Sequence, residues 1–134
     1  MRARLLTAAL LVAGAPTFSE TIVGADEFQQ LSEGKTQYFT RDGVEFGAEQ
    51  FYKNRTSTWQ YEDGTCTVGQ WYPVGDAICF VYEEQPVPQC WHVVRRDGNI
   101  YARLRGTAAG DVSELLMSHV DNKPVPCPAP DLGV

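Results

Sequence analysis

The chain has 134 residues, the length of a single domain, and a formal net charge of −6. An acidic surface repels phosphate groups, so this charge argues against nucleic acid and anionic lipid headgroups as partners. It favours cationic partners, although a charge of this size also serves simply to keep a small protein in solution.

Residues 1–19 have the pattern of a secretory signal peptide. Arg2 and Arg4 precede an apolar run over residues 5–13, which is far shorter than the roughly 20 residues needed to cross a bilayer. Cleavage is expected between residues 15 and 19, after Ala15 or after Ser19. Removing residues 1–19 takes away two basic residues and no acidic one, which changes the net charge to −8. No later stretch is apolar enough to span a membrane, so the sequence predicts a soluble periplasmic or secreted protein.

Residues 20–123 are expected to form one β domain. Ala25 to about residue 33 has helical composition and ends before Gly34, which predicts a short N-terminal helix at the end or edge of a sheet. Strands are expected around residues 36–40, 44–52 and 56–61. Asp42-Gly43 and Asp63-Gly64 are typical hairpin turns.

The second half continues the pattern. Further strands are expected at residues 65–72, 77–82, 90–95 and 100–105, with a loop over Glu83–Gln89, because Pro86 and Pro88 cannot donate to a sheet ladder. A short helix is expected over residues 111–117, with Asp111 as its N-cap. Residues 124–134 contain four prolines and should lie as an extended tail on the domain surface.

These elements predict a mainly β fold. Six to seven short strands joined by tight turns favour a small antiparallel meander barrel or a curled sheet, with a two-sheet sandwich as the alternative.

The four cysteines behind an export signal are expected to form disulfides. If the hairpin over residues 77–95 turns about Glu84 and Gln85, Cys79 lies opposite Cys90. Cys66 then pairs with Cys127 and fixes the tail. The other two pairings, Cys66–Cys79 with Cys90–Cys127 and Cys66–Cys90 with Cys79–Cys127, remain open. The chain has no CxxC motif, and it lacks the two close ligand pairs that a zinc site of cysteine and histidine needs, so the sequence predicts no redox cofactor and no metal site.

Aromatic residues are the strongest candidates for a binding site. Thirteen of them lie between Tyr38 and Tyr101, more than the core of a small barrel needs. Alternation directs some of them outward, and exposed aromatic side chains commonly mark binding surfaces. The candidate binding surface comprises Trp59, Trp71, Tyr72, Tyr82 and Trp91.

No catalytic residue is assigned. His92 lies on an expected strand without a nucleophile motif, and His119 lies in a polar stretch near the tail. Glu83 and Glu84 are adjacent, so in a strand they would point to opposite faces and would not form an acid/base pair. Surface positions explain these residues.

Several segments resemble a family of small exported bacterial proteins. They are GKTQYFTRDG (34–43), WQYEDGTC (59–66), GQWY (69–72), ICFVYE (78–83), PQCW (88–91) and CPAPDLGV (127–134). The resemblance implies an all-β fold and a periplasmic or secreted location. That family has no established activity, so the resemblance assigns no site residue.

The sequence therefore favours an exported, non-enzymatic binding module. Its ligand would be a small apolar molecule in the barrel mouth, or a protein or glycan on the aromatic face. The acidic charge makes a cationic protein, such as a lysozyme-like hydrolase, a candidate target for inhibition. The alternatives are a small periplasmic hydrolase that uses His92 or scattered carboxylates, and a structural component of the cell envelope.

Overall fold

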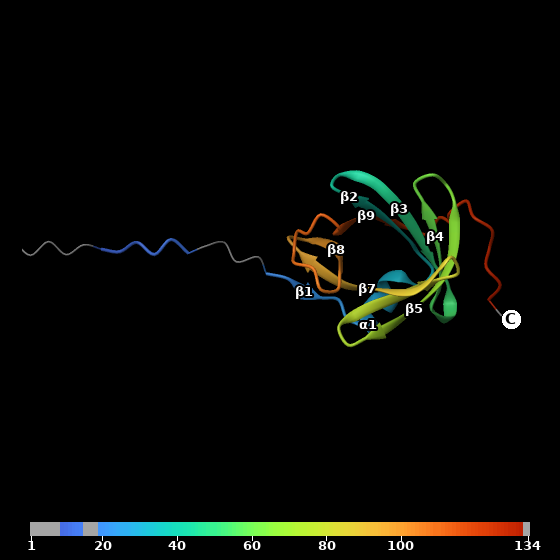
Figure 1. Cartoon of the computed structure of the whole chain (residues 1–134), viewed down its shortest axis with the longest axis horizontal. Coiled ribbons are helices and arrows are strands. Elements are labelled where there is room, and N and C mark those ends of the chain that lie inside the picture. The colour runs from blue at the N-terminus through green and yellow to red at the C-terminus, as the bar shows by residue number, and fades with distance from the viewer. Residues whose placement is uncertain (1–8, 15–18, 133–134) are drawn as a thin grey trace, which may run out of the picture.

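The computed structural model describes residues 9–14 and 19–132, and Figure 1 shows its strands arranged as a ring. The elements, in chain order, are β1 (Thr21–Ile22), α1 (Ala25–Ser32), β2 (Thr36–Arg41), β3 (Val44–Phe51), the 3-10 turn η1 (Lys53–Arg55), β4 (Thr56–Tyr61), β5 (Cys66–Val74), β6 (Ala77–Tyr82), β7 (Gln85–Arg96), β8 (Asn99–Leu104) and β9 (Leu115–Asp121). The predicted signal peptide and its cleavage positions fall largely outside the described residues.

The strands form a closed antiparallel barrel. Each strand from β2 to β9 pairs with the next, and β9 also pairs with β2, which completes a ring of eight strands. The short strand β1 pairs with β7 beyond the end of β6. The predicted mainly β fold and short N-terminal helix are confirmed. The expected six to seven strands and the curled sheet are corrected to eight strands and full closure.

The barrel strand missing from the sequence prediction is β9, where residues 111–117 were expected to be helical; the two-residue β1 outside the ring was not expected either. Asp111 accepts hydrogen bonds from the backbone nitrogen and the hydroxyl of Ser113 (2.9 and 2.6 Å), which makes a local turn. A turn of this kind and a helix N-cap use similar short-range bonds, so the local sequence does not separate them. Residues 115–121 instead pair with β2 and close the barrel.

The expected loop over Glu83–Gln89 is also corrected, because β7 already begins at Gln85. Tyr82 pairs with Gln85 and Phe80 with Gln89, so three residues, 86–88, lie opposite Val81 alone. Both prolines fall in this irregular stretch, where ladder bonds are interrupted. The turn therefore lies one residue earlier than expected, and the irregularity restores the register that places Cys79 opposite Cys90.

The expected two-residue turn forms at Asp42-Gly43 but not at Asp63-Gly64, where only Gly64 has positive φ (86°) and residues 62–65 all lie between β4 and β5. Asp42 and Gly43 both have positive φ (50° and 77°), and so do Asp97 and Gly98 (51° and 78°). Positive φ at both central residues is what the favoured two-residue hairpin turn requires. These turns join β2 to β3 and β7 to β8.

Helix α1 closes one end of the barrel. Phe28 points from it into a buried cluster and meets Trp71 and Phe51 edge to face, with ring centroids 4.9 and 5.6 Å apart. Val23, immediately before the helix, belongs to the same cluster. The core therefore lies between α1 and the strands at this end of the barrel.

Two disulfides cross-link the domain. Cys79–Cys90 joins β6 to β7, and Cys66–Cys127 joins the start of β5 to the tail after β9. The tail is held further by Val125, which is buried and donates its backbone N–H to Oε1 of Gln50 (3.0 Å). Two disulfides indicate that the protein folds in an oxidising compartment.

The segment before β1 is fixed by charge. The carboxylate of Glu20 pairs with Arg96 (3.0 Å) and Arg103 (2.5 Å), and Arg96 also pairs with Glu114. These side chains are mostly buried, so the pairs are less screened by solvent than surface pairs. No helix in the described part of the chain has the length and hydropathy needed to span a bilayer.

Candidate functional site

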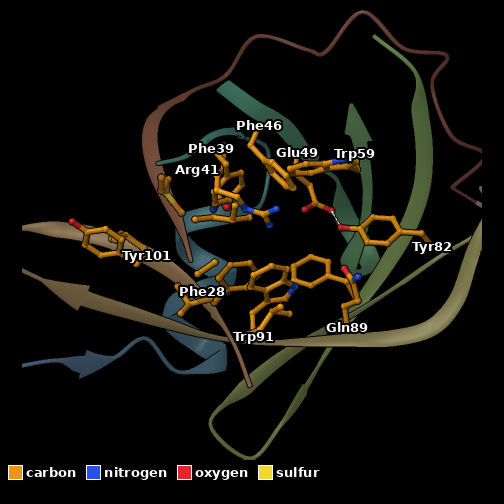
Figure 2. A pocket seen from close by; sticks show the side chains of 18 of the residues that line it. Phe28, Phe39, Arg41, Phe46, Glu49, Trp59, Tyr82, Gln89, Trp91 and Tyr101 are labelled. Atoms are coloured by element: carbon orange, nitrogen blue, oxygen red, sulfur yellow. Dashed lines mark hydrogen bonds between the residues drawn. The ribbon is translucent and has the colours of Figure 1, made fainter. Parts of the chain in front are cut away.

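The interior of the barrel contains a cavity of about 210 Å³. Most of its wall is aromatic or aliphatic, and the close-up in Figure 2 shows the side chains converging from strands all around the ring. The principal apolar lining residues are Phe28, Phe39, Phe46, Trp59, Phe80, Tyr82, Trp91, Val93, Ile100, Leu115 and Met117. The cavity can therefore hold a small apolar body.

The two ends of the cavity differ. Phe28 of α1 forms the floor at the closed end. At the other end, Arg41, Phe46 and Tyr101 line the cavity and also line a second hollow on the outer surface. These three side chains therefore lie between the interior and the outside, where a ligand would enter.

Two glycines make room for the aromatic wall. A Cβ atom at Gly47 would lie 2.3 Å from the Trp59 ring, and one at Gly69 would lie 2.6 Å from the Tyr82 ring. Contacts this short cannot be accommodated without moving the rings. The glycines on β3 and β5 thus let both rings lie flat against the backbone of a neighbouring strand.

Glu49 of β3 is the acidic residue of the cavity wall. It is 4% exposed, and its Oε1 accepts hydrogen bonds from the hydroxyls of Ser57 (2.7 Å) and Tyr82 (2.8 Å). Figure 2 shows its carboxyl group meeting the Tyr82 hydroxyl inside the hollow. Gln37, directly opposite on β2, is also buried, and its Oε1 has no hydrogen-bond donor.

Burial raises the pKa of Glu49 to about 7, and the hydrogen bonds from Ser57 and Tyr82 offset only part of that rise. Burial and the neighbouring Glu49 carboxyl also raise the pKa of Tyr82 well above its ordinary value. Tyr82 therefore stays a hydrogen-bond donor, while Glu49 changes charge near neutral pH.

This shift predicts a pH dependence of stability. Between pH 4.5 and about 7 the folded state holds a proton on Glu49 that the unfolded state has lost, so the free energy of unfolding falls as pH rises through this range. At about 1.4 kcal/mol per pKa unit, the loss is about 3 kcal/mol. In Glu49→Gln the side chain keeps its shape but does not titrate, so urea unfolding at pH 5 and pH 8 should lack this component.

The matched control is Glu45→Gln, an exposed glutamate on the same strand, which should keep the pH dependence of the original protein. Equal slopes of unfolding free energy against pH for the original protein and Glu49→Gln would contradict the assignment.

Arg41 is the basic residue of the cavity wall. Its guanidinium lies over the Phe46 ring at 4.0 Å from the centroid, and one terminal nitrogen is 3.5 Å from the carbonyl of Ser113. Its Nε is buried and has no hydrogen-bond partner. Among the described residues, no carboxylate forms an ion pair with Arg41.

The structure separates the five aromatic residues of the predicted binding surface. Trp59, Tyr82 and Trp91 line the cavity. Trp71 is buried beneath Phe28, and Tyr72 is 37% exposed on the outside of the barrel. The five therefore do not form one outer face, and three of them meet inside.

The remaining polar candidates lie elsewhere. His119 is exposed beside Asp121, with Nε2 at 3.2 Å from Oδ2, and Glu83 and Glu84 are exposed in the β6–β7 turn. In the part of the chain that the structure describes, no carboxylate lies within ion-pair distance of His92. The described residues also contain no group of three or more His, Cys, Asp or Glu side chains suited to hold a metal ion.

Sequence reasoning missed Glu49 and Arg41, although alternation carries a signal for both. Arg41 is two residues after Phe39 and four after Gln37, all on the inner face of β2. Glu49 is two residues before the buried Phe51. Comparison with known proteins adds no assignment: no family model, no curated protein and no solved structure matches the chain.

Proposed function

We propose that this protein is an exported binding protein that encloses a small, mainly apolar molecule in its barrel. The observation that carries the proposal is the aromatic-lined cavity, with a floor at α1 and an entrance at Arg41, Phe46 and Tyr101. A dry cavity of about 150 Å³ takes up benzene, so a cavity of about 210 Å³ suits one ring with short substituents.

The inward position of Trp59, Tyr82 and Trp91 favours a ligand inside the barrel over a protein or glycan on an outer aromatic face. The two disulfides support a periplasmic or secreted setting, and the bacterial source rests on the resemblance stated above. Inhibition of a cationic hydrolase, hydrolase activity and a cell-envelope role have no comparable support in the described residues.

The test uses 4-ethylbenzyl alcohol as a neutral one-ring probe and the three tryptophan indole N–H signals in an NMR titration. Trp59 and Trp91 line the cavity, whereas Trp71 does not. Binding in the barrel should shift the first two signals and leave the third nearly unchanged. Single Trp→Phe variants assign the signals.

Two variants separate cavity binding from surface binding. Ala102→Phe adds a ring to the cavity wall and should abolish the shifts, whereas Val74→Phe adds the same ring to an exposed position outside and should leave them intact. Unchanged signals for Trp59 and Trp91 at saturating probe, or equal shifts in Ala102→Phe, would overturn the proposal.

A further inference from the structure

The cavity wall carries one basic side chain, the half-buried Arg41, that has no carboxylate partner among the described residues. Arg41 lines the interior, its Nε–H is buried without an acceptor, and no described carboxylate pairs with it. Its terminal nitrogen reaches only the neutral carbonyl of Ser113, at 3.5 Å. A guanidinium stays charged at all physiological pH values, so it cannot remove this charge by losing a proton.

Glu49, the acidic group of the same cavity, behaves differently. It is held by Ser57 and Tyr82, and a carboxyl group neutralises itself by binding a proton. Because Oε1 accepts both hydrogen bonds, the proton of the neutral acid sits on Oε2. Neutral Glu49 is then a second hydrogen-bond donor in the cavity.

The interior thus offers a fixed cation with a free N–H at the entrance and an aromatic chamber behind it. Figure 2 shows Arg41 and Glu49 both reaching into the same hollow. A carboxylate is the planar anion whose two oxygens match the donor fork of a guanidinium. A ligand carboxylate would supply a negative charge to pair with Arg41 and an acceptor for its Nε–H.

We propose, building on the binding function above, that the ligand is a small monocarboxylate whose carboxylate pairs with Arg41 at the entrance while its apolar body fills the aromatic chamber. The Phe46 ring holds the guanidinium in place from one face, so the arginine is positioned before the ligand arrives.

The carboxylates around the entrance, called here the acidic rim, oppose the binding of an anion. The outer hollow is lined by the carboxylates of Asp42, Glu45, Glu62, Asp111 and Glu114. They repel an approaching anion and attract a cation. Glu114 is neutralised by Arg96, and none of the five lines the interior cavity. The acidic rim opposes an anion both on entry and when it is bound at the entrance, and the direct pair with Arg41 must outweigh this repulsion.

The experiment compares three probes of matched shape by isothermal titration calorimetry at pH 7: 4-ethylbenzoate, 4-ethylbenzyl alcohol and 4-ethylbenzylammonium. The benzoate should bind at least tenfold more tightly than the alcohol. Arg41→Met keeps an unbranched apolar stem over Phe46 but lacks the charge. In this variant the benzoate should lose at least tenfold in affinity while the alcohol binds as before. Arg105→Met, at an exposed arginine, should change neither value.

Each outcome decides the question. A benzoate preference that disappears in Arg41→Met supports the proposal. Equal or tighter binding of the alcohol overturns it and leaves the binding function standing. Tightest binding of the ammonium overturns it in favour of Glu49 and the acidic rim as the partner. Failure of all three probes to bind the original protein overturns both the proposal and the binding function. If Arg41→Met does not fold, the probe order in the original protein still decides.

Discussion

Replacing Phe28 with alanine is expected to lower the free energy of unfolding by about 3 to 5 kcal/mol. The ring is 2% exposed and packs edge to face against Phe51, Trp71 and Phe80. Its removal leaves a void between α1 and the strands that rigid barrel walls can fill only in part. Urea unfolding with the disulfides intact measures the loss.

The matched control is Gln30→Ala on the exposed side of α1, which should change stability by less than about 0.5 kcal/mol. Such a pair distinguishes loss of the Phe28 contacts from a general weakening of the helix. A cost below 1 kcal/mol for Phe28→Ala would show that α1 is not held to the barrel by this ring.

Removing the Cys66–Cys127 bridge by the double change Cys66→Ala and Cys127→Ala is expected to cost about 4 kcal/mol. The bridge closes a loop with a sequence separation of 61 residues, and without it the unfolded chain gains the corresponding freedom. The tail should also detach more often, so the amide of Val125, which donates to Gln50, should exchange its hydrogen faster.

The other bridge provides the comparison. Cys79 and Cys90 are separated by 11 residues, so replacing both by alanine should cost about 3 kcal/mol and leave exchange at Val125 unchanged. A larger cost for the short bridge than for the long one would show that loop entropy does not dominate the effect of these cross-links.

The sequence predicts the central hairpin well because its alternation is regular. Alternation over residues 77–95 with Cys79 opposite Cys90 places Ile78, Phe80, Tyr82, Trp91 and Val93 on one face; four of them line the cavity, and Ile78 is buried in the cluster beneath α1. The short helix and the mainly β fold follow from local composition in the same way. Closure does not, because it depends on pairing between β2 and β9, whose residues Thr36 and Asp121 are far apart in the chain.

Glu49 shows why the site was harder to predict than the fold. Glu45 and Glu49 are four residues apart and would share a face of a regular strand, yet Glu45 is exposed and Glu49 is buried. The pairing of β3 with β2 skips Phe46, since Thr40 pairs with Glu45 and Phe39 with Gly47. This bulge changes the inward face between Glu45 and Glu49, so alternation points Glu49 inward only when it is counted back from Phe51.

The long bridge also sets an order of events during folding. Cys127 follows β9, so Cys66 cannot reach its partner until every barrel strand has left the ribosome or the translocation channel. Cys79 and Cys90 emerge earlier and lie on adjacent strands, so they can be joined first. When the short bridge forms first, Cys127 is the one partner thiol left for Cys66. The long bridge can then form only after β9, whose pairing with β2 closes the barrel, has been made.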